Sequence, residues 1–112
     1  MMKTYYNPDD LARFADISQY DKALADKFFN WYNEVFAEGA LSAREKSLIA
    51  LAVAHALQCP YCIHAYTEDA LAKGYSEEQM MEAVHVAAAI RGGASLVHAT
   101  QMMNRINQLS IS

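Results

Sequence analysis

The sequence predicts an all-α protein. Its 112 residues include only two prolines and four glycines, and no Asn-Gly or Asp-Gly pair marks a hairpin between strands. Two capping boxes, Ser42 to Glu45 and Ser76 to Gln79, mark helix starts. A hydrophobic content of 54% excludes intrinsic disorder. We expect a single domain over residues 1–112, with an N-terminal helical layer at 1–40 and a core region at 41–108.

The N-terminal layer is predicted to contain two helices. Asn7 is an N-cap residue, and Pro8 suits the first helical position, so a short helix runs to about Ile17. A second helix is expected from about Ser18 to Glu38, ended by Gly39. Nine of the twelve aromatic residues precede position 37, which indicates a layer that covers the core.

The next helix is predicted to be the centre of the fold. It is opened by the capping box of Ser42 and Glu45. Residues 47–67 carry no Asp, Glu, Lys or Arg, and residues 48–57 are apolar except for His55. This pattern is typical of a helix that is buried on all sides.

Three further helices are expected. Cys59 and Pro60 begin one that ends at Gly74, and Ser76 opens another toward Ile90. The Gly92-Gly93 pair is predicted to interrupt that helix. A last helix then runs until the chain frays near Ser110.

Charge and hydropathy exclude several partners. The net charge of −4 gives no basic field for a phosphate backbone, so we expect no nucleic-acid partner. The longest apolar stretch, residues 48–57, is about half of the roughly 20 residues that a membrane span needs. The first ten residues lack the apolar core of a secretory signal, so we expect a cytoplasmic protein without a membrane partner.

The segment Cys59-Pro60-Tyr61-Cys62 is the strongest functional signal. Two thiols at this spacing can form a disulfide, and a helix N-terminus favours the thiolate. A thiolate can reduce a peroxide or exchange with a disulfide partner. Half of a zinc site and an inert buried pair are the alternatives. Because no second CxxC and no Cys-His pair at finger spacing is present, we expect no metal and no cofactor.

These residues resemble the carboxymuconolactone decarboxylase superfamily, and specifically its alkylhydroperoxidase AhpD-like branch. The resemblance covers residues 43–103: ArgGluLysSerLeuIleAlaLeuAlaVal, CysProTyrCysIleHisAlaTyrThr and the Gly92-Gly93 segment. The stretch from Glu82 to His98 is most similar to a subgroup called arsenosugar-biosynthesis-associated peroxidase-like proteins. The resemblance implies an AhpD-like helical bundle in which a buried helix leads into the CxxC.

The resemblance also implies a reaction. Cys62 would react with the hydroperoxide, Cys59 would resolve the product as a disulfide, and an external dithiol would reduce that disulfide. The family motif places a glutamate twelve residues before the first cysteine and a histidine four after the second. This chain has Ser47 and Tyr66 at those positions.

Helical spacing suggests substitutes for that pair. His55 lies four residues before Cys59, and Ser47 lies two turns before His55, so one helix face could direct both toward the thiols. His55 is the candidate base, and a core histidine bonded to a backbone carbonyl is its alternative. Tyr66 could offer its hydroxyl to the thiolate or the peroxide. His64 is a weaker candidate, since it lies only two residues after Cys62.

Three functions fit the sequence. The first is a thiol peroxidase of small or alkyl hydroperoxides. The second is a disulfide oxidoreductase or redox relay without efficient peroxidase activity, which the loss of the usual glutamate and histidine favours. The third is a non-catalytic member of the fold. Since members of the family are trimers or hexamers, the resemblance also implies a homo-oligomer.

Overall fold

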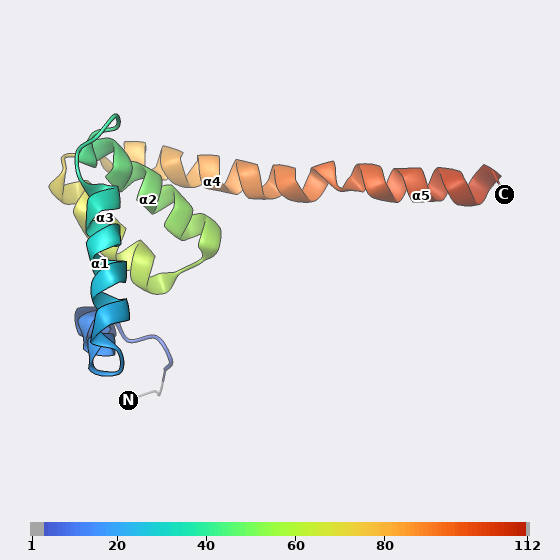
Figure 1. Ribbon diagram of the computed structural model, residues 1–112. Coiled ribbons are helices and arrows are strands. Elements are labelled where there is room, and N and C mark those ends of the chain that lie inside the picture. The colour runs from blue at the N-terminus through green and yellow to red at the C-terminus, as the bar shows by residue number, and fades with distance from the viewer. Residues whose placement is uncertain (1–3, 112) are drawn as a thin grey trace.

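Helices form every regular element of the computed structural model, which describes residues 4–111 (Figure 1). No strand occurs within this range. The all-α prediction is therefore confirmed. The elements in chain order are a 3-10 helix, η1 (Pro8–Gln19), and the α-helices α1 (Lys22–Phe36), α2 (Ala43–Leu57), α3 (Pro60–Ala72), α4 (Glu77–Val97) and α5 (Ala99–Ile111).

Side-chain caps fix most of the helix ends that the sequence predicts. The Ser42 hydroxyl accepts a hydrogen bond from the Glu45 amide at 3.0 Å, and the Glu45 carboxylate accepts one from the Ser42 amide at 2.9 Å. The backbone bond from Ser42 lowers the pKa of Glu45. Ser76 caps α4 in the same way, and Asn7 caps η1. Gly74 follows α3 with a φ of 86°, in the left-handed region that suits glycine.

The second predicted helix is shorter than expected. It begins at Lys22 rather than Ser18, because the Asp21 carboxylate accepts a backbone hydrogen bond and acts as the N-cap. The helix ends at Phe36, before the predicted stop at Gly39.

The glycine pair does not interrupt the fourth α-helix. Helix α4 continues through Gly92 and Gly93 and ends at Val97. A glycine inside a helix costs about 1 kcal/mol relative to alanine, but it does not force the helix to end. The break falls at His98 instead, and α5 ends at Ile111, close to the predicted end near Ser110.

Helix α2 packs between α3 and α4, and the core forms along this contact. Leu51 of α2, Ala70 of α3 and Tyr75 of the following turn are buried together. The prediction that α2 is buried on all sides is wrong for the single chain. Ile49 and Val53 are each 49% exposed and Leu57 is 71% exposed, and their spacing places them on one face of the helix.

A buried polar contact joins α2 to α3. Ser47 is fully buried, and its hydroxyl donates to the Asp69 carboxylate at 2.6 Å. Lys73 donates to the other carboxylate oxygen, also at 2.6 Å. Burial acts to raise the pKa of Asp69, but the bonds from Lys73 and Ser47 and the Lys73 charge outweigh it, so that the pKa lies below its ordinary value.

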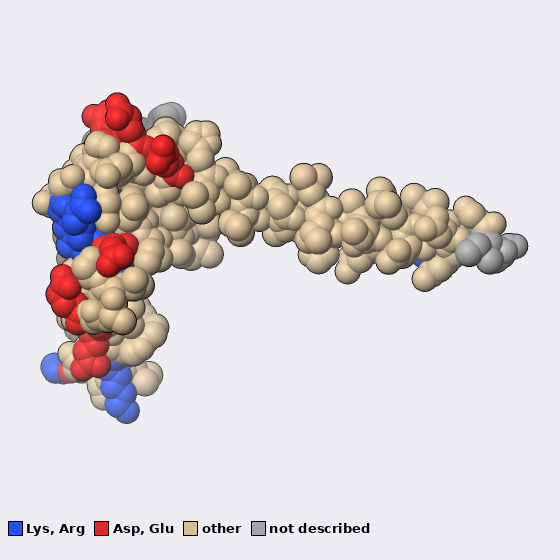
Figure 2. Space-filling model, turned by 90° about the horizontal axis from the view of Figure 1, so that it is seen from above, with Lys and Arg blue, Asp and Glu red and all other residues tan. Residues whose placement is uncertain are grey.

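Residues 88–111, the second half of α4 and the whole of α5, form an arm that extends away from the other helices (Figure 1). Every residue from 88 to 110 is exposed except Ala99, which is half-buried. The radius of gyration is 19.6 Å, whereas a compact domain of this length has about 13 Å. Arg91 and Arg105 are the only charged residues between positions 83 and 111, and Figure 2 shows the arm almost without charge. Within the described residues, no helix is long and apolar enough to cross a membrane.

The buried contact makes a stability prediction. Ser47→Ala should lower the free energy of unfolding by on the order of 1–2 kcal/mol near neutral pH, because Asp69 loses a buried donor. A carboxyl with a lowered folded pKa stabilises above its unfolded pKa, and the effect is lost as the pH falls. The cost of Ser47→Ala should therefore shrink toward about pH 3.

Urea unfolding at a fixed protein concentration measures both effects. Ser110→Ala is the control, since Ser110 is exposed near the end of α5. An equal cost at the two pH values would contradict this account of the contact.

Candidate functional site

The two cysteines lie at the beginning of α3 and form a disulfide, with their Cα atoms 5.2 Å apart. The turn that leads into them is short. Gln58 ends α2 in the left-handed conformation, and the Cys59 amide donates to the Ala54 carbonyl at 3.1 Å. The Cys59 sulfur in turn accepts a hydrogen bond from the Cys62 amide at 3.3 Å. Cys59 is thus the N-cap of α3, as the sequence predicts.

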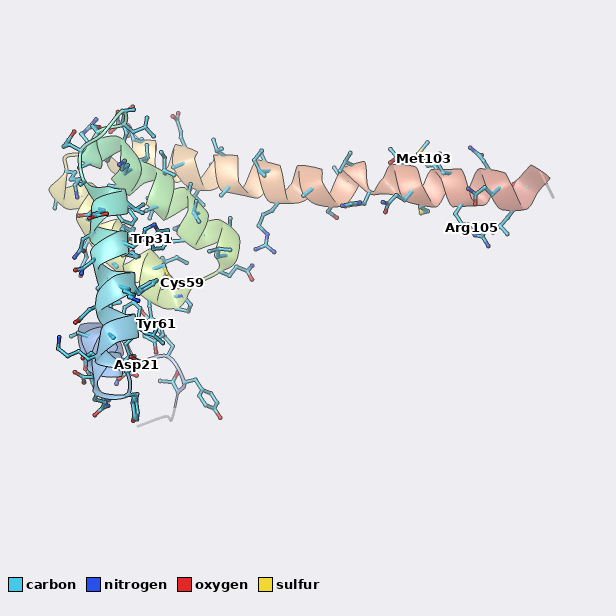
Figure 3. All side chains as sticks on the ribbon, in the orientation of Figure 1. Asp21, Trp31, Cys59, Tyr61, Met103 and Arg105 are labelled. Atoms are coloured by element: carbon cyan, nitrogen blue, oxygen red, sulfur yellow. A yellow bond between two sulfur atoms is a disulfide. The ribbon has the colours of Figure 1, made fainter. Side chains whose placement is uncertain are left out.

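Both cysteines line a cavity of about 1090 Å³ between η1, α1 and α3. Figure 3 shows Cys59 and Tyr61 beside α1, far from Met103 and Arg105 on the arm. Eight aromatic side chains lie in the cavity wall: Phe28, Phe29, Tyr32 and Phe36 from α1, Tyr61 and Tyr66 from α3, Phe14 from η1, and Tyr20 directly after η1. The aromatic N-terminal layer therefore covers the helix that carries the cysteines.

Tyr66 lies in this cavity one helical turn after Cys62. Its hydroxyl and the hydroxyl of Tyr32 share a hydrogen bond in which either oxygen can donate. The Phe36 ring stacks on Tyr66 with a centroid distance of 5.3 Å and an interplanar angle of 17°. The position that carries a histidine in the family motif is thus occupied by a phenol that has a polar partner.

Ser47 does not contact the cysteines directly. It donates to Asp69, which lines the cavity together with Lys73. The carboxylate in this region therefore comes from α3, while α2 supplies a hydroxyl where the family motif has a glutamate.

The two histidines of the predicted site do not line the cavity. The Nδ1 of His55 donates to the Leu51 carbonyl at 2.8 Å, and the ring borders a smaller hollow that also involves α4. The Nε2 of His64 lies 3.3 Å from a carboxylate oxygen of Glu68 on the same helix. Helical spacing predicts that His55 is the base, and this stays a prediction. The contact of the His55 ring is with Leu51 and not with a cysteine sulfur.

Four residues of this region were not predicted from the sequence. Asp69 and Lys73 follow Cys62 at spacings of seven and eleven residues, which match one face of a helix, so periodicity could have found them. Tyr32 comes from a distant segment, and no local signal indicates it. Arg91 of α4 donates to the Ala56 carbonyl at the end of α2 and brings a positive charge close to the turn before Cys59.

The described residues include no group of three or more His, Cys, Asp or Glu side chains that could hold a metal ion. The two sulfurs are bonded to each other. The chemistry that the residues offer at this place is therefore the formation and reduction of a disulfide beside an apolar cavity with phenol groups.

Comparison with known proteins places the chain in a family. Residues 22–105 match the model of the carboxymuconolactone decarboxylase family. The uncharacterized protein 4 in the cox locus of Paracoccus denitrificans is 39% identical over 102 residues, which cover 91% of this chain and 92% of that protein.

Solved structures agree with this match. A protein from Methanobacterium thermoautotrophicum aligns with a TM-score of 0.74 and 35% identity, covering 77% of this chain and 97% of that one. A carboxymuconolactone decarboxylase family protein from Legionella pneumophila aligns with a TM-score of 0.68 and 29% identity, covering 82% of each chain. A family member from Thermotoga maritima aligns with a TM-score of 0.59 and 25% identity, covering 78% of this chain and 90% of that one. A part in an antioxidative response has been suggested for that protein.

The matched family model covers both cysteines, helix α2 before them and most of the arm. The likeness to the Legionella pneumophila family member supports the same all-α fold. The chain belongs to the carboxymuconolactone decarboxylase family.

Proposed function

We propose that this protein is a thiol peroxidase that reduces small or alkyl hydroperoxides through a dithiol–disulfide cycle of Cys59 and Cys62. The observation that carries the proposal is the bonded cysteine pair in the wall of an aromatic cavity that is large enough for an organic hydroperoxide. The antioxidative role suggested for the Thermotoga maritima relative supports it.

In the first step, the Cys62 thiolate attacks the hydroperoxide. A sulfur–oxygen bond forms, the oxygen–oxygen bond breaks, and Cys62 becomes a sulfenic acid, while the leaving alkoxide takes up a proton to become the alcohol. The sulfur lies in the first turn of α3, where free backbone amides and the helix dipole favour the thiolate.

In the second step, Cys59 attacks the sulfenic sulfur, the disulfide forms, and the sulfenic hydroxide leaves and takes up a proton to become water. The Cys62 amide that donates to the Cys59 sulfur stabilises negative charge on Cys59, which this attack requires. An external dithiol then reduces the disulfide by exchange. We propose that the cycle operates in the cytoplasm, where reductants keep thiols reduced.

Disulfide exchange with a partner protein is the second candidate function. Ser47 and Tyr66 favour it, because they replace the glutamate and histidine of the peroxidase motif. It requires the same cysteines but no peroxide. It predicts a stable mixed disulfide with the partner when one cysteine is replaced.

We also propose that the protein is a homo-oligomer, a trimer or a hexamer. Two apolar surfaces support this proposal: the stripe of Ile49, Val53 and Leu57 on α2, and the arm, on which Ile90 is 70% and Leu96 is 76% exposed. Exposed apolar areas of this extent are typical of subunit contacts.

Cysteine variants test the peroxidase. Reduced wild-type protein should consume cumene hydroperoxide repeatedly when a dithiol is present, and Cys62→Ser should reduce the rate to background. Cys59→Ser should form one sulfenic acid per chain without forming the disulfide, measured with a sulfenate-trapping reagent and mass spectrometry. Equal rates for wild type and Cys62→Ser would contradict the peroxidase function and leave disulfide exchange as the remaining candidate function.

A histidine variant tests the predicted base. Since the His55 ring bonds Leu51 and does not border the cavity, His55→Gln should leave the pH profile of Cys62 alkylation unchanged. His64→Gln is the control for removing an imidazole near the motif. A shift of the His55→Gln profile to higher pH, absent from the control, would instead identify His55 as the base.

Sedimentation tests the oligomer. At micromolar concentration the wild-type protein should have the mass of a trimer or a hexamer. Ile90→Glu places a charge on the apolar arm and should produce smaller species, while Lys27→Glu on the exposed side of α1 should not. A wild-type monomer would refute the proposal.

A further inference from the structure

We propose that Tyr66, oriented by Tyr32, donates the proton to the oxygen that leaves when Cys62 attacks a hydroperoxide. The inference rests on the peroxidase function proposed above and assigns the acid of its first step. An alkoxide is a poor leaving group in an apolar cavity, so a proton donor beside the breaking bond is the chief chemical need of that step.

The position of Tyr66 suits this role. Residues four apart on a helix lie on the same face, so Tyr66 is the side-chain neighbour of Cys62 along α3. Both residues line the cavity in which a hydroperoxide would bind. Neither histidine near the motif lines it, and Tyr66 is the phenol in its wall that lies one helical turn after Cys62.

The hydrogen bond with Tyr32 can orient the Tyr66 hydroxyl proton toward the cavity. In the bond between the two phenols only one oxygen donates. When Tyr32 donates, the Tyr66 oxygen is the acceptor and its own proton is available to a bound peroxide. Burial and, secondarily, the charge of Asp69 raise the pKa of Tyr32, so Tyr32 stays protonated and can donate to the tyrosinate that forms when Tyr66 gives up its proton.

Aromatic packing holds the pair in place. The Phe36 ring stacks on Tyr66, and its centroid lies 4.9 Å from that of Tyr32. A phenylalanine at position 66 or 32 would keep these ring contacts and lose only the hydroxyl. The hydroxyl groups can therefore be tested separately from the packing.

The proton balance of the step is complete. The thiolate sulfur bonds to the distal peroxide oxygen, the electron pair of the oxygen–oxygen bond goes to the leaving oxygen, and Tyr66 protonates it to the alcohol. The hydrogen bond from Tyr32 stabilises the tyrosinate that results, and solvent returns the proton. A phenol is a stronger acid than an alcohol, so the transfer is favourable.

The test uses pre-reduced protein in single turnovers, so that the measured rate does not depend on the reducing agent. Loss of the Cys62 thiol is followed by quenched-flow alkylation with two oxidants. Cumene hydroperoxide releases a strongly basic alkoxide and needs an acid. Peracetic acid releases acetate and needs none.

Tyr66→Phe should slow the reaction with cumene hydroperoxide by about 10²-fold and leave the reaction with peracetic acid unchanged. Tyr32→Phe, which removes the positioning hydroxyl, should show a smaller loss with the same selectivity. Tyr66→His should restore part of the lost rate, because an imidazole can also donate. Tyr5→Phe is the control, because Tyr5 is fully exposed and does not line the cavity.

Alkylation of Cys62 by iodoacetamide, at a pH where the thiol is ionised, should be equal in all variants. Equal slowing of both oxidants by Tyr66→Phe, or of neither, would overturn the assignment of Tyr66 while leaving the peroxidase intact. Wild-type protein that reacts with neither oxidant faster than Cys62→Ser would overturn both proposals.

Discussion

The turn between α2 and α3 is the constraint on which the candidate site depends. Only Gln58 and Cys59 separate the two helices, and the left-handed backbone of Gln58 lets the Cys59 amide return to the Ala54 carbonyl. This conformation costs a residue other than glycine roughly 1 kcal/mol, which the packing of α2 against α3 offsets. Because the turn is so short, the core contacts of two helices determine where both sulfurs lie.

Local signals predicted the fold well where the chain caps itself. The boxes at Ser42 and Ser76 involve residues three apart, so their chemistry can be read from the sequence. The predicted start of α1 and the predicted break in α4 were wrong. Several residues could cap or end each of these helices, and which of them does so depends on contacts with the rest of the chain. The division into a layer at 1–40 and a core at 41–108 stays a prediction.

The candidate site was predictable in the part that lies along α3. Cys59, Cys62 and Tyr66 follow from a motif and a helical period, and Asp69 would follow from the same period. Tyr32 would not, since it reaches the cavity from a helix that begins 38 residues before α3 in the chain. At the two positions where the motif has a glutamate and a histidine, this chain has residues that make separate hydrogen bonds. Ser47 bonds Asp69, and Tyr66 bonds Tyr32.

The Cys59 sulfur belongs to the disulfide and is also the side-chain cap of α3. A thiolate accepts an amide hydrogen bond more strongly than a disulfide sulfur does, so this cap is stronger whenever reduced Cys59 is ionised and weaker in the disulfide. The first turn of α3 is therefore a structural reporter of the oxidation state of the cysteines. Amide hydrogen exchange at Cys62 would follow the redox state without a chemical label, because that amide is the donor in the cap.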